Sequence, residues 1–138
     1  MSVAEAIRTD DLARALHQRL GAHVLAEQRT GEPFPVLWVA PEAWVEAHRI
    51  LREEIDRPFA LMADLWGTDE TARRNRAGLP ASGVTLASHL ISPQRNADIR
   101  LKLACDAEAP RAPTLTGVYP GADWYEREAW DMLGVRFD

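Results

Sequence analysis

A strand pattern at residues 97–106 constrains the fold of this 138-residue chain more than any other feature. Apolar side chains stand at every second position and alternate with Arg100 and Lys102. Successive side chains of a strand point to opposite faces, so this pattern predicts a strand with one buried face. The other face is expected to be wet or covered by a partner. The buried set is Ile99, Leu101, Leu103 and Cys105.

Four further segments are predicted to be strands: residues 22–29, 34–39, 59–66 and 84–91. Pro33 and Pro35 place the start of the second segment at a sheet edge or at its entry point. The segment 59–66 is mostly apolar, so we expect it to be a central strand.

Three segments are predicted to be helices. In residues 10–20, leucines four positions apart form one stripe, and Gly21 stands where a glycine cap would end a helix. Pro41 opens the second helix and Pro58 ends it. The third runs from 123 to 133. The apolar stripe of the second helix is Trp44, Ala47, His48, Leu51 and Ile55.

The order α-β-β-α-β-β-β-α predicts an α+β fold, with one mixed, mostly antiparallel sheet of about five strands and about three helices. The length favours a single domain over residues 1–138. The arginine-rich segment 67–83 is predicted to be an ordered loop, and residues 107–113 a proline-bearing linker.

Composition excludes several functions. A net charge of −5 argues against nucleic-acid binding, which needs a basic surface. No apolar run approaches the roughly 20 residues of a membrane-spanning helix. A single cysteine, Cys105, cannot supply the roughly four thiolates of an iron–sulfur cluster. No glycine-rich phosphate-binding motif is present.

Candidate catalytic and metal-binding sets are weak. The four histidines (His17, His23, His48 and His89) lack the spacing of a metal site, which favours packing or surface roles. Asp64, Asp69 and Glu70 could bind a hard cation, but turn and capping roles are favoured because a calcium loop needs a different ligand pattern. Ser88 and His89 are strand neighbours that point to opposite faces, which prevents a nucleophile–base pair.

The segment 119–134 is the most informative. Asp123 followed by Glu126 has the spacing of a capping box, and Gly134 is placed to end the helix. Trp124 and Trp130 fall off the apolar stripe, so one or both should be exposed or covered by a partner. Arg127 and Asp131 lie four apart and could pair. The predicted buried stripe is Tyr125, Ala129, Met132 and Leu133.

This segment resembles the 30-kilodalton subunit family of complex I, whose members are also called C subunits. The motif is Glu126-Arg127-Glu128, Asp131, Met132-Leu133 and Gly134, preceded by Tyr119-Pro120 and Trp124-Tyr125. Residues 59–65, 89–92 and 98–102 also look like strands of that family, so the resemblance spans roughly residues 36–138. In the family a His-Pro step and a basic, apolar run normally follow the motif, whereas this sequence ends at Phe137-Asp138. We therefore expect a truncated C-terminus. The middle loop looks like the form in which the C and D subunits are fused.

The resemblance implies a structural and assembly subunit in the peripheral arm of a proton-translocating NADH:quinone oxidoreductase, on the cytoplasmic side of the inner membrane. The chain itself would hold no cofactor, while the parent complex would contain NAD, FMN, iron–sulfur clusters and quinone. The D subunit and the cluster-bearing B and I subunits would be its partners. The motif residues Glu126, Arg127, Glu128, Asp131 and Gly134, with Trp124 and Trp130, would form the subunit interface.

Three alternatives stay open. An equivalent subunit occurs in membrane-bound hydrogenases and formate hydrogenlyase, and fold analogy does not separate these complexes. A small stand-alone enzyme would use Asp64, Asp69 and His89, and it predicts a pocket in which these groups converge. A free-standing adaptor would bind one soluble partner.

Overall fold

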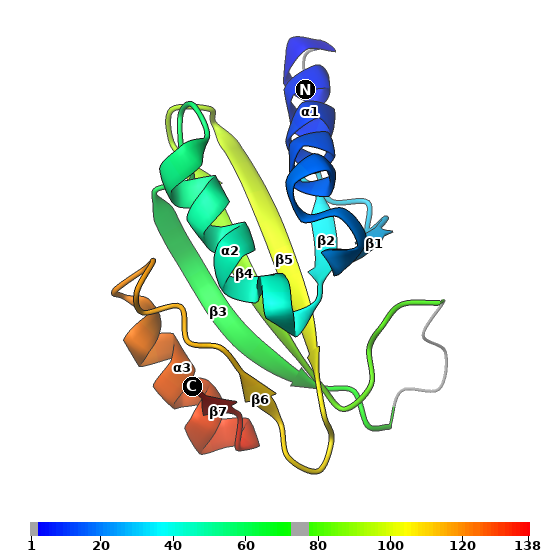
Figure 1. Cartoon of the computed structure of the whole chain (residues 1–138), viewed down its shortest axis with the longest axis vertical. Helices are drawn as coiled ribbons and strands as arrows, with labels where there is room; N and C mark the ends of the chain where they lie inside the picture. Colours follow the sequence, from blue (N-terminus) through cyan, green and yellow to red (C-terminus); the bar gives the residue numbers. More distant parts are fainter. Residues whose placement is uncertain (1–2, 73–77) are drawn as a thin grey trace.

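The computed structural model describes residues 3–72 and 78–138, with the backbone alone for residues 3–11 (Figure 1). The helices are α1 Val3–Leu20, α2 Trp44–Arg49 and α3 Ala122–Leu133, with short helical turns at Gly21–His23, Pro41–Ala43 and Ile50–Glu54. The strands are β1 Val24–Gln28, β2 Val36–Val39, β3 Leu61–Asp69, β4 Val84–Ser92, β5 Ala97–Cys105, β6 Arg111–Ala112 and β7 Arg136–Phe137. The arginines of the predicted 67–83 loop, Arg73, Arg74 and Arg76, lie outside the described residues.

The main sheet has five strands in the order β1-β2-β5-β4-β3. Only the β2–β5 pair is parallel, and the other three pairs are antiparallel. The predicted α+β class and the mixed, mostly antiparallel sheet are therefore confirmed. The long β4–β5 hairpin follows the predicted alternation to within one residue at each end.

The position of β3 corrects the sequence prediction, because this strand lies at an edge of the sheet and not at its centre. It also extends to Asp69 and so includes the start of the predicted loop. Leu65 is buried, but Leu61 is 51% exposed. β3 has a neighbouring strand on one side only, and α3 lies alongside it (Figure 1).

The main core lies between the sheet and α2. The second predicted helix is a 3₁₀ turn from Pro41, then α2, then a π-helical turn, and its stripe residues Trp44, Ala47, His48 and Leu51 are buried. Leu12, Leu16 and Leu20 of α1 belong to the same core. Exposed ion pairs from Arg19 to Glu46 and Glu54 connect α1 to this helical segment.

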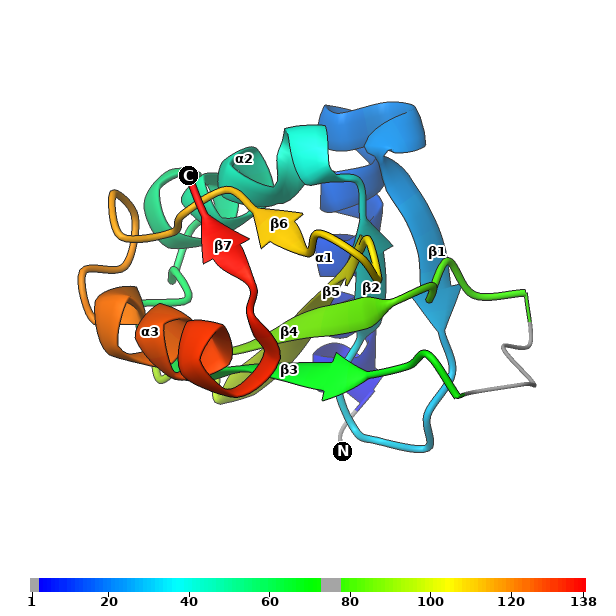
Figure 2. The same cartoon turned by 90° about the horizontal axis from the view of Figure 1, so that it is seen from below.

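A second, two-stranded parallel sheet joins β6 to β7. The predicted linker 107–113 therefore contains a strand, whose partner lies beyond α3. Figure 2 shows β6, β7 and α2 on the same side of the main sheet. The β6–β7 pairing therefore joins the segment that follows α3 to the segment that follows β5.

Candidate functional site

Contacts near the start and near the end of α3 hold this helix against β3. The hydroxyl of Tyr125 donates a hydrogen bond to the backbone carbonyl of Ala63 at 3.2 Å, and Ala129 is buried. Gly67 of β3 leaves room for Leu133, because a Cβ at that position would come within 2.5 Å of the leucine Cδ1. Gly134 ends the helix in the left-handed conformation (φ 72°), as predicted, and its N–H donates to the carbonyl of Trp130.

Glu126 of the family-like motif lies inside the protein. Its Oε1 accepts a hydrogen bond from the Thr114 hydroxyl and its Oε2 accepts one from the Leu115 backbone N–H, each at 2.7 Å. Burial raises the pKa of the Glu126 carboxyl, although these two hydrogen bonds oppose the change. The carboxylate therefore fixes the turn before α3 to the helix.

The expected capping box is consequently wrong. The N-cap residue is Gly121, it makes no side-chain cap, and Asp123 lies within the first turn of the helix. The Glu126 carboxylate accepts hydrogen bonds from residues 114 and 115, which precede the helix, and not from the backbone N–H groups at the N-terminus of α3. The spacing of Asp123 and Glu126 predicted the cap, but the Glu126 carboxylate accepts hydrogen bonds from Thr114 and Leu115 instead.

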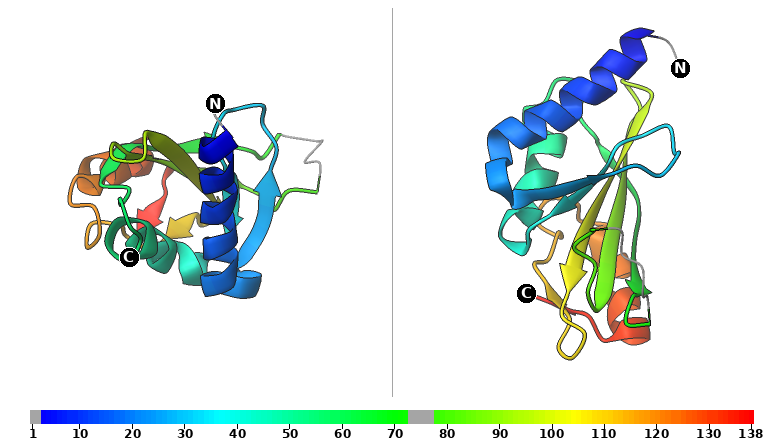
Figure 3. Two further views of the ribbon diagram at one scale, coloured as in Figure 1. Left: turned by 90° about the horizontal axis from the view of Figure 1, so that it is seen from above. Right: turned by 90° about the vertical axis from the view of Figure 1, so that its right-hand side faces the viewer.

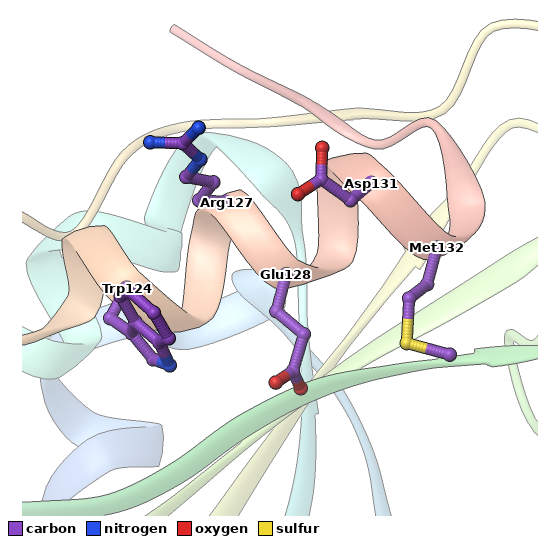
Figure 4. Close-up of a pocket in the computed structure, with 5 residues that line it drawn as sticks. All are labelled: Trp124, Arg127, Glu128, Asp131 and Met132. Carbon is purple, nitrogen blue, oxygen red and sulfur yellow. The ribbon is translucent and has the colours of Figure 1, made fainter.

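The outer face of α3 exposes large apolar side chains. Trp124 is 73% exposed, Met132 76% and Trp130 49%, so both tryptophans lie outside the core as predicted. In Figure 4, Trp124, Glu128 and Met132 point to one side of the helix, and Arg127 and Asp131 point to the other. These five residues line a shallow surface hollow of about 500 Å³. We call this set, together with Trp130, the α3 outer face.

Two further expectations for this helix need revision. Met132 was predicted to be buried, but the helix rotation places Ala129 and Leu133 toward β3 and turns Met132 outward. Among the ion pairs of the described residues, none joins Arg127 to Asp131. Both charges therefore remain on the surface beside exposed aromatic rings.

The stand-alone-enzyme alternative places Asp64, Asp69 and His89 in one site, but the structure brings only Asp64 and His89 side by side. Asp64 is the register partner of His89, whereas Asp69 pairs with Val84. Five residues along β3 correspond to roughly 16 Å. His89 Nε2 lies 2.7 Å from an oxygen of Asp98 instead.

The acidic groups Asp64 and Asp69, both within β3, have local roles. One oxygen of Asp69 accepts hydrogen bonds from the N–H and the hydroxyl of Thr71, which lower the pKa of this carboxyl. Asp64 accepts the N–H of Leu65 at 2.8 Å. Among the side chains that the structure describes, in residues 12–72 and 78–138, no group of three or more His, Cys, Asp or Glu could hold a metal ion.

Other candidates for chemistry lie in the interior. Cys105 is buried, as predicted, and burial raises the pKa of its thiol to about 11. Ser88 points away from His89 and contacts His48 of α2, a pairing that strand and helix periodicity separately could not reveal. Neither member of this pair is exposed. No helix in the described part of the chain is long and apolar enough to cross a membrane.

Comparison with protein families identifies the fold and the motif. Residues 37–138 match the family described as "Respiratory-chain NADH dehydrogenase, 30 Kd subunit". The chain belongs to this family. The match includes the whole motif from Tyr119 to Gly134, so the resemblance predicted from these residues is confirmed.

Several curated relatives are fused proteins. The chain is 61% identical over 127 residues to the NADH-quinone oxidoreductase C/D subunit of Cereibacter sphaeroides, a match that covers 92% of this chain and 21% of that protein. It is 56% identical over 128 residues to the C/D subunit of Rhodopseudomonas palustris, covering 93% and 22% respectively. The chain therefore spans about a fifth of the length of these relatives.

Two solved structures share the fold. The trypsin-resistant fragment (1-134) of Nqo5 has a TM-score of 0.73 at 20% identity and covers 92% of this chain and 95% of its own. A chain of the membrane-bound sulfane sulfur reductase, an archaeal respiratory membrane complex, has a TM-score of 0.71 at 22% identity, covering 95% and 71%. At these identities the comparison establishes the architecture.

Proposed function

We propose that this chain is the C-type part of a proton-translocating NADH:quinone oxidoreductase and serves assembly rather than catalysis. The observation that carries the proposal is the family match over residues 37–138, together with relatives that are fused C/D proteins. The chain would form the N-terminal part of such a fused protein and lie in the peripheral arm, on the cytoplasmic side of the membrane.

The α3 outer face is the proposed contact surface. Exposed Trp and Met side chains beside Arg127 have the composition of protein interfaces, where aromatic residues, Met and Arg are enriched. Glu128 and Asp131 add charges at the rim. Glu126 and Gly134 belong to the same motif but act within the domain, because one binds the 114–115 segment and the other ends the helix.

The proposed partners are the D subunit and the cluster-bearing B and I subunits. NAD, FMN, iron–sulfur clusters and quinone would be held by other parts of the complex. The buried thiol of Cys105 and the separation of Asp64 from Asp69 along β3 support a chain that contributes contacts rather than a catalytic site.

A second candidate is the equivalent subunit of a membrane-bound hydrogenase or a related respiratory complex. The observation that favours it is the fold shared with the sulfane sulfur reductase chain, at 22% identity. The two candidates predict the same type of contact surface but different electron donors for the assembled complex.

The test replaces Trp124 or Met132 with Ser in the complete protein, in its own host. Both side chains are exposed, so the melting temperature of the domain should stay unchanged while recovery of the intact complex falls. Leu25→Ser is the matched control, because Leu25 is 49% exposed on β1, away from α3. NADH oxidation by the purified complex would separate the first candidate from the second. Normal recovery of complex from both α3 variants would contradict the assigned surface.

A further inference from the structure

The sheet face turned away from α2 carries the cations Arg100 and Lys102, beside the carboxylates of Asp64 and Asp98, on a chain whose net charge is −5. Ser88 contacts α2, and its register partner on β5 is Leu101. Arg100 and Lys102 are the neighbours of Leu101 on β5. Their side chains therefore point to the opposite face of the sheet. Figures 2 and 3 show α2 on the other side of the sheet. We call this surface the outer sheet face.

Two aromatic rings hold Arg100 in place. Its guanidinium carbon lies 4.9 Å from the ring centre of Phe34 and 5.0 Å from that of Trp66. Such cation–π contacts fix the direction of the guanidinium without neutralising its charge. Its Nε is buried without a hydrogen-bond partner, and none of the ion pairs of the described residues includes Arg100. The cation is thus ordered but has no carboxylate partner in the described chain.

Lys102 adds a second positive charge to the same face. Its Nζ lies 5.4 Å from the ring centre of Trp38 and donates a hydrogen bond to the side-chain oxygen of Gln28 at 3.2 Å. Lys102 stands two residues from Arg100, so their Cα atoms are separated by roughly 7 Å along β5. The two carboxylates on this face have other contacts, because Asp98 lies 2.7 Å from His89 Nε2 and Asp64 accepts the N–H of Leu65.

A thin apolar layer lies beneath the two cations. Val36, Trp38 and Ala87 are at most 2% exposed, yet they are not part of the main core between the sheet and α2. An apolar floor excludes water and strengthens an ion pair formed above it. Aromatic rings and Arg above such a floor are typical of the centre of a protein interface.

We propose that the outer sheet face binds a carboxylate-rich segment of a neighbouring protein subunit, with Arg100 as the anchor and Lys102 as the second contact. Charge complementarity identifies the occupant, because an ordered guanidinium forms forked hydrogen bonds with a carboxylate. Two cations give too little attraction to bring a chain of net charge −5 to an anionic bilayer. The inference rests on the proposed function, in which the chain is part of a larger assembly.

Lys102 makes a direct test possible, because it is the only lysine among these 138 residues. A carbodiimide joins a lysine amine to a carboxylate that it contacts. In the intact complex we expect Lys102 to become joined to an Asp or Glu of another subunit, as identified by mass spectrometry. Lys102→Arg keeps the charge and should abolish this linkage. Absence of any Lys102 linkage, or linkage only to carboxylates of its own chain, would overturn the proposal.

A second measurement examines the anchor. Arg100→Gln should lower recovery of the intact complex at raised salt by about tenfold or more, as expected when one partner of a buried ion pair is removed. Arg29→Gln, an exposed arginine just beyond β1, is the control and should have no effect. Thermal melting of the Arg100 variant shows that loss of complex is not loss of fold. Unchanged recovery of a folded Arg100→Gln variant would count against the anchor role.

The outcomes separate this inference from the proposed function. If the α3 variants impair assembly and Arg100→Gln does not, the outer sheet face is not an interface while the proposed function stands. If neither set of variants impairs assembly, both proposals fail. Binding of the protein to phosphatidylglycerol vesicles that is lost in Arg100→Gln would assign the face to lipid and overturn the acidic-segment proposal.

Discussion

The imidazole Nε2 of His48 lies 2.7 Å from the hydroxyl oxygen of Ser88, and both side chains are fully buried between α2 and β4. The imidazole Nδ1 lies 2.7 Å from the backbone carbonyl of Trp44. A carbonyl only accepts, so Nδ1 carries the proton and Nε2 of the neutral ring accepts the Ser88 hydroxyl proton. The pair resembles a nucleophile and its base, but substrate cannot reach it. Its role is to join the helix to the sheet.

The His48 contact predicts an acid-sensitive fold. Burial lowers the pKa of His48 from 6.5 to about 4, against the opposing effect of the hydrogen bond to Trp44. The unfolded chain therefore binds a proton more readily than the folded chain. This contribution to stability is present above pH 6.5 and is lost as the pH falls toward 4, which amounts to roughly 3 kcal/mol.

Chemical unfolding of wild type and His48→Gln across this pH range measures the effect. The difference between the two unfolding free energies should change between pH 6.5 and 4, whatever the constant cost of the substitution. Exposed carboxylates titrate equally in both proteins and cancel. A difference independent of pH would show that His48 does not cause the acid sensitivity.

The buried carboxylate of Glu126 predicts a contrast between two substitutions. Gln can accept the Leu115 N–H through its oxygen and donate to the Thr114 hydroxyl, so Glu126→Gln should cost less than about 1 kcal/mol at neutral pH. Ala leaves the Leu115 N–H without an acceptor and should cost about 1–3 kcal/mol. Urea unfolding of both variants checks the order, and equal costs would contradict the hydrogen-bonding role.

The close approach of the Ala107 backbone to Gly83 predicts that a side chain at position 83 destabilises the fold. A Cβ at this position would lie 2.2 Å from the backbone nitrogen of Ala107, and backbone cannot move aside as a flexible side chain can. Gly83→Ala should therefore cost about 1–3 kcal/mol. Gly117→Ala is the control, because no atom lies within 4 Å of its added Cβ. Comparable melting temperatures for the two variants would refute the close approach.

Regular alternation explains which parts of the fold could be predicted from sequence. The β4–β5 hairpin was predicted almost to the residue, since Leu101 and Leu103 alternate with Arg100 and Lys102 over a long strand pair. Periodicity shows that a side chain is buried but not what buries it. The placement of β3 at the centre of the sheet came from the apolar composition of residues 59–66, but β3 lies at an edge, where Leu65 is its one buried residue and α3 packs alongside.

The details of the candidate site depend on contacts that are distant in sequence. Glu126 binds residues 11 and 12 positions before it, in a segment without periodicity, so helix spacing suggested a cap instead. The two-residue strands β6 and β7 are too short to produce a pattern. The pairing of Ser88 with His48 joins positions 40 apart. Exposure of Trp124 and Trp130 was predictable because both fall off the helical stripe.

Leu133 and Met132 are adjacent in sequence, but one packs against the core and the other is exposed. We therefore expect truncation of Leu133 to affect folding and truncation of Met132 to affect assembly. Leu133 is partly buried against Gly67 of β3, so Leu133→Ala should cost about 1–3 kcal/mol, less than for a fully buried leucine. Met132 is 76% exposed, so Met132→Ala should change the free energy of unfolding by no more than about 0.5 kcal/mol. If Met132 contacts a partner subunit, its truncation should nevertheless weaken assembly, because a few large side chains carry most of the binding energy at an interface. Parallel measurement of unfolding and of complex recovery for both variants distinguishes the two roles. A Met132→Ala protein that both melts and assembles normally would remove Met132 from the proposed contact surface.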